Sequence, residues 1–151
     1  SYEMAGNDFL LFGGIENKIK LYVNKTNRAV NVNVNGISHF LCVTWSSTAG
    51  DWKVYVNGTE IESGSGLSQG ESIPSGGTWI LGQEQDSPGG GFDTNQAFAG
   101  EISLLNVWDR VLTEAEIGAT CGGTAGGNII NWGRDTFELF GQVTTRISAV
   151  E

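Results

Sequence analysis

Three carboxylates are crowded into one glycine-rich stretch, "GQEQDSPGGGFDTNQ" at residues 82–96. Glu84 and Asp86 are two residues apart, so in an extended backbone their side chains point to the same side. The glycines that follow allow the chain to fold back, which brings Asp93 and Gln96 toward them. Carboxylates at such short range repel one another. The stretch therefore indicates either a cation site or an acidic loop exposed to solvent.

The composition limits the partners of such a site. The chain has 151 residues and a formal net charge of −9. This length suits one domain, and the charge argues against nucleic acid or an anionic membrane as partner, since both need a positive surface. No apolar run is long enough for a membrane span or for membrane insertion. The two cysteines, Cys42 and Cys121, are compatible with two thiols or with a disulfide. The sequons at Asn24 and Asn57 predict glycosylation and favour secretion.

Alternating apolar and polar residues predict short strands along most of the chain. In "AVNVNVNG" (29–36), every second residue is a valine, as in a strand with one buried face. "HFLCVTW" (39–45) is mostly apolar on both faces, which indicates a central strand. Residues 52–61 predict a hairpin around the turn Asn57–Gly58. A loop is predicted at 63–72, and further strands at 78–82, 100–108, 128–132 and 137–143.

One helix is predicted in "LTEAEIGATCGG" (112–123). Thr113 is placed to cap its start, with Glu116 reaching back to the capping residue. Gly122 and Gly123 are suited to end it. Many short strands with one short helix predict an all-β sandwich.

Several segments together resemble the pentraxin family: "HFLCVTW", "WKVYVNG", "ILGQEQDSPGGGFDTNQAFAGEISLLNVWDRVLTEAEI" and "NIINW". The resemblance covers nearly the whole chain in order and spacing. It implies an all-β, two-sheet antiparallel jelly-roll sandwich, concanavalin- or laminin-G-like, with one short helix near 113–121. It also implies a secreted, calcium-dependent, lectin-like pattern-recognition protein of innate immunity, which assembles into a homo-oligomer, with a ring as the expected form.

The start of the chain, "SYEMAGNDFLLF", resembles a segment that the family reaches only after several earlier strands. We therefore expect residues 1–151 to be a single pentraxin-like domain that lacks its first strands. The resemblance implies that Cys42 pairs with a cysteine in the earlier part of the domain rather than with Cys121. The partner of Cys121 is expected in that same missing segment or in another chain.

The resemblance implies that the acidic loop holds two neighbouring calcium ions. By position, Glu84 and Asp86 bridge both ions, and Gln85 offers its backbone carbonyl. Asp93 and Gln96 complete the outer ion. Calcium takes six to eight oxygen ligands, which carboxylates, amides and backbone carbonyls supply together.

The inner ion takes further ligands from the earlier segment in the family, where an Asp–Asn pair is typical. Here Asn7 matches the asparagine, whereas Gly6 stands where the aspartate is expected. Asp8 becomes the substitute after a shift of one residue. This departure makes the inner ion less secure than the outer one.

The family also has a ligand pocket beside the calcium ions. By position, Phe12 and Tyr22 line this pocket; the alternative is that both are strand residues that pack a sheet face. The ligand implied is a small anionic molecule bearing phosphate or carboxylate, or a glycan, bound through calcium. No acidic partner for a choline-like cation can be aligned.

Two other functional classes fit part of the sequence. Glu84 and Asp86 resemble a glycosidase carboxylate pair, but a retaining enzyme needs two carboxylates about 5 Å apart with one kept protonated. Calcium bound to both prevents that, so no enzymatic activity is expected. The second alternative is a pentraxin-like protein-interaction module of a larger adhesion receptor or matrix protein, which Gly6 and the extra Cys121 favour.

Other residue types that suggest chemistry are assigned to structure. His39, the only histidine, begins a strand with no cysteine or second histidine nearby. Asp109 precedes the helix and suits a turn or an interface. The five tryptophans lie in strand-like contexts and are expected in the core: Trp45, Trp52, Trp79, Trp108 and Trp132.

Overall fold

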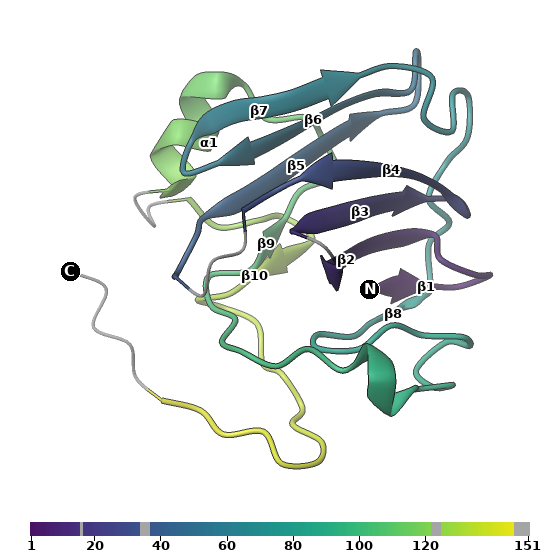
Figure 1. The fold of residues 1–151 in the computed structure, drawn as a ribbon, viewed down its shortest axis with the longest axis vertical. Coiled ribbons are helices and arrows are strands. Elements are labelled where there is room, and N and C mark those ends of the chain that lie inside the picture. The colour runs from purple at the N-terminus through teal and green to yellow at the C-terminus, as the bar shows by residue number, and fades with distance from the viewer. Residues whose placement is uncertain (16, 34–36, 122–124, 147–151) are drawn as a thin grey trace.

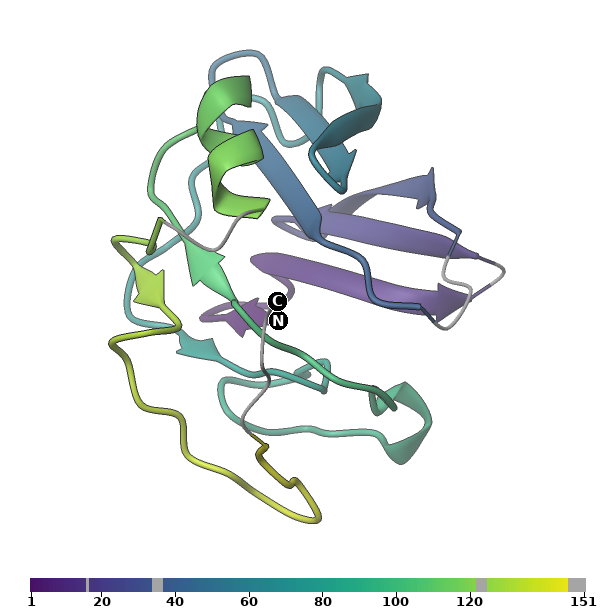
Figure 2. The same ribbon diagram turned by 90° about the vertical axis from the view of Figure 1, so that its left-hand side faces the viewer.

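The computed structural model describes residues 1–15, 17–33, 37–121 and 125–146. Its main feature is two antiparallel sheets that face each other (Figures 1 and 2). The five-stranded sheet has the order β4-β3-β2-β1-β8, where β1 is Tyr2–Glu3, β2 Phe9–Ile15, β3 Lys18–Val23, β4 Thr26–Asn31 and β8 Thr78–Trp79. The three-stranded sheet has the order β5-β6-β7, where β5 is Leu41–Ser46, β6 Asp51–Val56 and β7 Thr59–Gly64. The predicted two-sheet, all-β architecture is confirmed.

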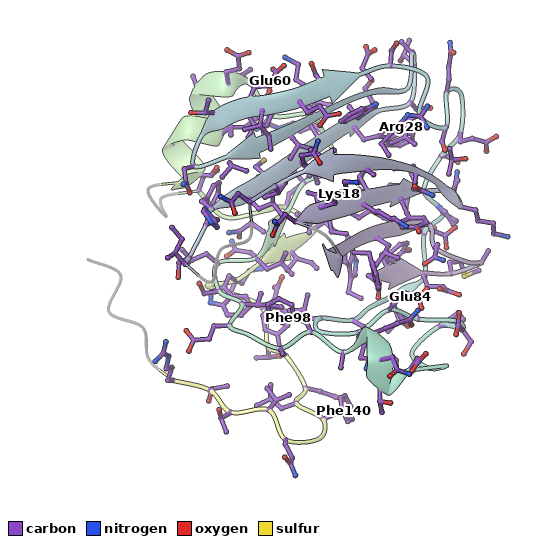
Figure 3. All side chains as sticks on the ribbon, viewed as in Figure 1. Lys18, Arg28, Glu60, Glu84, Phe98 and Phe140 are labelled. Atoms are coloured by element: carbon purple, nitrogen blue, oxygen red, sulfur yellow. The ribbon has the colours of Figure 1, made fainter. Side chains whose placement is uncertain are left out.

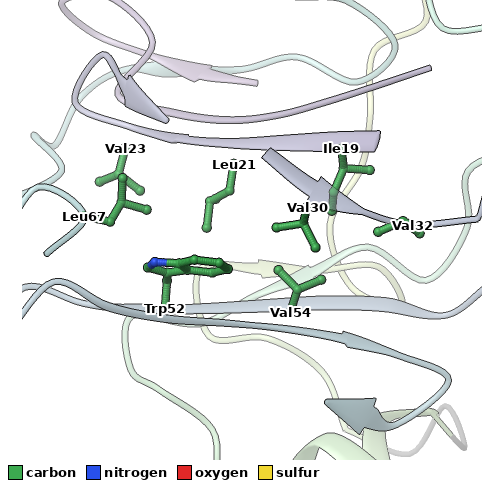
Figure 4. Packing of buried hydrophobic residues seen from close by; sticks show 8 residues of the cluster. All are labelled: Ile19, Leu21, Val23, Val30, Val32, Trp52, Val54 and Leu67. Atoms are coloured by element: carbon green, nitrogen blue, oxygen red, sulfur yellow. The ribbon is translucent and has the colours of Figure 1, made fainter. Parts of the chain in front are cut away.

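The core lies between these two sheets (Figure 4). Alternate residues of β3 point inward, because successive side chains of a strand lie on opposite faces. Across the gap, Trp52 and Val54 of β6 pack against them. The buried residues of this cluster are Ile19, Leu21, Val23, Val30, Val32, Trp52, Val54 and Leu67. Trp45, one of the tryptophans expected in the core, is partly buried against the same cluster.

A second, smaller cluster covers the opposite face of the three-stranded sheet. Tyr55 follows Val54 on β6 and therefore points away from the main core. It packs with Leu112 and with Ile117 of helix α1 (Glu114–Cys121), against which Cys42 and Trp108 also lie. The helix is thus held against the outside of the second sheet (Figure 2).

The start of α1 and the hairpin confirm two local predictions. The Thr113 amide donates to Glu116 Oε2 at 2.8 Å, and the Glu116 amide donates to Thr113 Oγ1 at 3.3 Å, which is the expected capping box. In the hairpin, Val56 pairs with Thr59 around Asn57 and Gly58, whose φ angles are +51° and +79°. Such angles are those of a tight two-residue turn. The predicted helix end at Gly122 and Gly123 lies outside the described residues.

Other strands are shorter than predicted or displaced. The strand predicted at 29–36 begins earlier, at Thr26, and ends at Asn31, with Val34 outside the described residues. In 100–108 and 128–132, only β9 (Asn106–Val107) and β10 (Ile130–Asn131) pair. Residues 137–143 form no strand. An extended segment needs a hydrogen-bonded neighbour to form a ladder. Outside β9 and β10, the predicted strands in these ranges have no such neighbour in the described part of the chain.

The loop predicted at 63–72 contributes to the core. Leu67 is fully buried, and its carbonyl accepts a hydrogen bond from Trp45 Nε1 at 2.8 Å. Ser68 Oγ donates to the Val23 carbonyl at 2.7 Å. The loop therefore closes one end of the sandwich. No helix in the described residues is long and apolar enough to cross a membrane.

Candidate functional site

The acidic stretch forms a closed loop beside β1 and β8. The Phe98 amide donates to the Gly82 carbonyl at 2.9 Å, and Gln83 Nε2 donates to the Asp93 carbonyl at 3.0 Å. A tight turn at residues 87–90 lies inside it, with the Gly90 amide 2.8 Å from the Ser87 carbonyl. These contacts bring the two halves of the stretch together. That the Asp93 and Gln96 side chains meet Glu84 and Asp86 at one ion stays a prediction.

Gln85 fixes this loop to the sheet through its side chain. The side chain is fully buried, and its Nε2 donates to the Thr78 carbonyl at 3.1 Å and to Ser1 Oγ at 3.0 Å. Its Oε1 accepts from the Gly89 amide at 2.7 Å. Sequence reasoning considered only its backbone carbonyl as a ligand. A glutamine in a polar run gives no sign that its side chain points inward.

Gly91 is required where the loop folds back on Asp86. Its φ is +71°, and a Cβ at this position would lie 2.7 Å from Asp86 Cβ. A larger residue would therefore be strained in the left-handed region and would collide with its neighbour. The Asp86 carboxylate itself is exposed at the surface of the loop.

Gln96 is the last residue of η1, a single 3-10 turn at Thr94–Gln96, and Asp93 is its N-cap. Asp93 Oδ1 accepts from the Asn95 amide at 2.8 Å and from Asn95 Nδ2 at 3.0 Å, which caps this turn. The cap holds Asp93 and Gln96 three residues apart on one rigid turn. Figure 3 shows Glu84 between this turn and β1.

The turn between β1 and β2 carries both predicted N-terminal ligands, and the Asn7 side chain reaches Glu84 of the acidic loop. Asp8 is buried, and its Oδ2 accepts from the amides of Met4 and Ala5 at 2.7 and 2.8 Å. Asn7 has a φ of +46°, and its amide donates to Glu3 Oε2 at 3.3 Å. Asp8 thus has one oxygen committed to the turn, and its role as a ligand stays a prediction.

Four buried side-chain oxygens around this loop and turn have no hydrogen-bond partner. They are Asn7 Oδ1, Gln83 Oε1, Glu84 Oε2 and Gln96 Oε1, and within the described ranges no other buried side-chain oxygen lacks a partner. A buried polar group without a partner costs about 1–3 kcal/mol. Three of the four belong to residues predicted as calcium ligands. A bound cation is one kind of partner that such oxygens accept.

The electrostatics of Glu84 point the same way. Burial raises the pKa of the Glu84 carboxyl, and the negative charges of Asp86 and Glu3 raise it further. A hydrogen bond from the Asn7 side chain and the α-ammonium of Ser1 oppose the rise in pKa but do not cancel it. The carboxyl therefore lies in a place that disfavours its negative charge unless a cation is present.

The donor set fits calcium better than a metal that needs several charged ligands. No group of three or more His, Cys, Asp or Glu side chains is arranged to hold a metal ion in the part of the chain that the structure describes. The unpartnered oxygens come instead from two glutamines, an asparagine and a glutamate. Calcium accepts amide and backbone oxygens together with carboxylates, so the residues present fit this ion.

The two predicted pocket residues lie on one face of the five-stranded sheet. Phe12 is directly opposite Lys20, and Tyr22 is directly opposite Leu10. Opposite residues share a face, and so do residues two apart in a strand. Phe12 and Tyr22 therefore lie on the face that points away from the main core. Glu3 pairs with Thr78 on β8 and alternates with the core-facing Tyr2, so it lies on the same face.

The other predicted sites are spread over the molecule. Asn24 donates its Nδ2 to the Ser72 carbonyl at 3.1 Å, and Asn57 Oδ1 accepts from the Phe40 amide at 2.9 Å. Cys42 is half-buried on β5 against the α1 cluster. The side chain of Cys121, at the end of α1, lies outside the described part. Glycosylation and both cysteine pairings stay predictions.

Known proteins resemble this chain along most of its length. The model of the Pentaxin family matches residues 1–147. Neuronal pentraxin-1 of Rattus norvegicus is 39% identical in an alignment of 150 residues that covers 95% of this chain and 35% of the relative. The sushi, von Willebrand factor type A, EGF and pentraxin domain-containing protein 1 of Rattus norvegicus is 39% identical in an alignment of 159 positions that covers 99% of this chain and 4% of the relative.

A solved structure shares the fold. The native heptameric SAP-like pentraxin from Limulus polyphemus superposes with a TM-score of 0.74 at 31% sequence identity, over 85% of this chain and 63% of the neighbour. The chain thus spans 35% of the length of neuronal pentraxin-1 and 63% of the Limulus polyphemus chain. Because the family model covers nearly every residue and the sandwich agrees with a solved member, the chain belongs to the Pentaxin family.

Proposed function

We propose that this chain is a calcium-dependent, lectin-like ligand-binding module of a secreted pentraxin. The observation that carries the proposal is the set of unpartnered buried oxygens from Asn7, Gln83, Glu84 and Gln96. Oxygen atoms that no protein donor reaches, beside a glutamate whose charge is disfavoured, are those expected of a metal site in its metal-free form. Two calcium ions remain the expectation, with the inner ion less secure because Gly6 offers no carboxylate.

The ligand is proposed to bear phosphate or carboxylate, or to be a glycan that carries such groups. Phe12 and Tyr22 share their sheet face with Lys20, a half-buried lysine directly opposite Phe12. Lys20 forms no ion pair with any residue that the structure describes. An aromatic surface beside an ammonium group favours an anion and disfavours a cationic head group such as choline.

Assembly into a closed homo-oligomer is part of the proposal. The support is the heptameric state of the Limulus polyphemus pentraxin. An interface between identical subunits must close into a ring or it continues into a filament. Binding rather than catalysis is proposed because a carboxylate shared with calcium is not available as a general acid.

The second candidate is a protein-interaction module within a larger adhesion receptor or matrix protein. It is favoured by the relative that has sushi, von Willebrand factor type A and EGF domains, of which this chain matches only 4%. In that case the fold and its surface would be retained while calcium-dependent ligand binding is lost. Calcium titration of the full-length protein separates the two candidates.

The test uses beads that carry phosphate monoester, phosphocholine or a neutral hydroxyl linker. Wild-type full-length protein is expected to bind the phosphate monoester in calcium and to elute in chelator. Lys20→Gln should weaken this binding several-fold, while the matched variant Lys53→Gln, on the other sheet, should bind as wild type does. Equal retention on all beads with and without calcium would reject the binding function.

A further inference from the structure

We propose that Glu3 is an additional ligand of the metal site, and that it supplies a second buried carboxylate beside Asn7 and Glu84. This inference rests on the proposed function, since it concerns the same calcium site. Glu3 matches none of the positions that the sequence predicted as ligands. It is assigned from its burial, its contacts and the lack of a basic side chain paired with it.

Glu3 and Glu84 are both almost completely buried, at 3% and 6% exposure. Glutamates are rarely buried to this degree unless a positive group pairs with them. Neither buried glutamate takes part in the ion pairs found between described residues, which involve Lys53, Arg110, Arg134 and Arg146. The positive group near Glu84 is the α-ammonium of Ser1. Two negative groups are therefore buried together without a basic side chain.

Three segments of the chain bring oxygen donors to one place. Glu3 comes from β1, Asn7 from the turn that follows, and Glu84 from the acidic loop. The Glu3 carboxylate folds over the turn, so that its Oε2 accepts from the Asn7 amide. Glu84 in turn accepts a hydrogen bond from the Asn7 side chain and interacts electrostatically with Glu3. Asn7 thus lies in contact with both glutamates.

The unpartnered atoms are independent of this crowding of acids. Asn7 Oδ1 and Glu84 Oε2 are buried and have no hydrogen-bond donor. A divalent cation between the two glutamates would contact these oxygens and neutralise both charges. Calcium is the ion that combines an amide oxygen with carboxylates in this manner.

Asp8 is the other buried acid of the turn, and its contacts differ. One Asp8 oxygen accepts two backbone amides at 2.7 and 2.8 Å. Glu3 accepts one amide at the longer distance of 3.3 Å. A carboxylate offers about four lone-pair sites, so Glu3 retains more capacity for a metal than Asp8 does.

The competing explanation is that Glu3 only supports the turn. Glu3→Gln separates the two roles, because the amide oxygen of glutamine still accepts the Asn7 N–H while the negative charge is removed. Glu138→Gln is the matched control, since Glu138 is exposed in the 137–143 segment. Calcium affinity and stoichiometry are measured by isothermal titration calorimetry on the full-length protein, and melting temperature is measured in chelator.

We expect Glu3→Gln to weaken calcium binding by more than about tenfold, since even outer-shell partners of metal ligands are worth that much. Its melting temperature in chelator should be unchanged or higher, because a buried charge is removed. Wild-type calcium affinity in Glu3→Gln would overturn the assignment and leave the calcium function standing. If the wild type itself binds no calcium, both proposals are overturned. Glu3→Asp, which keeps the charge on a shorter arm, should lower affinity without changing folding, and replaces Glu3→Gln as the test if that variant does not fold.

Discussion

Glu116 and Glu84 are two glutamates of one chain in opposite surroundings. Glu116 accepts from Arg110 Nη2 at 2.6 Å and from the Thr113 amide at 2.8 Å, and these hydrogen bonds, that from Arg110 first, lower the pKa of its carboxyl to about 2. Glu84 is buried with one oxygen unpartnered, and burial raises the pKa of its carboxyl. The chain itself thus satisfies the first charge. The second charge is only partly satisfied, by the Asn7 side chain and the Ser1 α-ammonium.

The largest effect is expected from the hydrophobic core between the two sheets, away from the acidic loop. Leu67→Ala removes a fully buried side chain, which should destabilise the fold by about 2–5 kcal/mol. The loss should be the same in calcium and in chelator, because Leu67 belongs to the sandwich rather than to the acidic loop. Urea denaturation under both conditions measures it. A loss seen only in calcium would mean that core and loop are not separable.

Calcium should have the next largest effect. At one hundred times its dissociation constant it should stabilise the fold by about 2.7 kcal/mol. In chelator the loop should loosen, so that a protease cleaves first between Gln85 and Asp93 while the sandwich strands stay intact. Thermal melting and limited proteolysis of the full-length protein measure both effects. The same cleavage pattern in calcium and in chelator would show that the loop binds no calcium and is only an acidic loop exposed to solvent.

Glu84→Gln tests the unsatisfied glutamate directly. We expect at least about a tenfold loss of calcium affinity, about 1.4 kcal/mol, with no loss of stability in chelator. Gln96→Glu should cost less affinity, because Gln96 is placed on the outer ion alone. Calorimetric titration compares the two variants. A larger loss in Gln96→Glu would contradict the assignment of Glu84 as the bridging ligand.

Thr113→Ala tests the hydrogen-bonded surroundings of Glu116 by removing the N-cap side chain of α1. Loss of an N-cap side chain costs about 1 kcal/mol. Calcium affinity should not change, because α1 lies on the outer face of the second sheet. Thr136→Ala, at an exposed position, is the control. Denaturation curves that coincide for the two variants would show that the capping box carries no stability.

The smallest effect is a difference in pH dependence. The folded pKa of Glu84 is raised, so the folded state holds its proton more tightly than the unfolded state. In chelator, stability should therefore rise as the pH falls from 7 toward the unfolded value, and Glu84→Gln should lack this rise. The folded pKa of Glu116 is lowered, so its contribution is present above the unfolded value of 4.5 and is lost as the pH falls toward about 2. Urea titrations of wild type and Glu84→Gln across this range compare the two, and parallel curves would refute the predicted sign for Glu84.

The sequence predicted the parts of the fold that depend on local chemistry. The Asn57–Gly58 turn and the capping box of Thr113 and Glu116 were found because each depends on residues close together in the chain. The strands at 100–108 and 137–143 were overestimated. Their alternation shows only that they suit a sheet, whereas pairing also requires a neighbouring strand.

The candidate site was predicted less completely than the fold. Glu84, Gln96 and Asn7 were expected as ligands, and each has an unpartnered buried oxygen. Glu3 and the side chain of Gln85 were missed, because their orientation depends on how β1 pairs with β8 rather than on nearby residues. Leu67 did carry a signal, since it is a lone large apolar residue in a run of glycines and serines.

The buried side-chain amide of Gln85 links the acidic loop to β1 and β8, so metal binding in the loop would affect hydrogen exchange in these strands. Its hydrogen bonds to Ser1, Thr78 and Gly89 hold the acidic loop against the edge of the five-stranded sheet. If the loop opens without metal, the Gln85 hydrogen bonds break, and β1 and β8 open more easily together. Deuterium uptake at these two short strands would then follow metal occupancy, although neither carries a loop residue. Exchange at this edge of the sheet would therefore report whether the metal site is occupied.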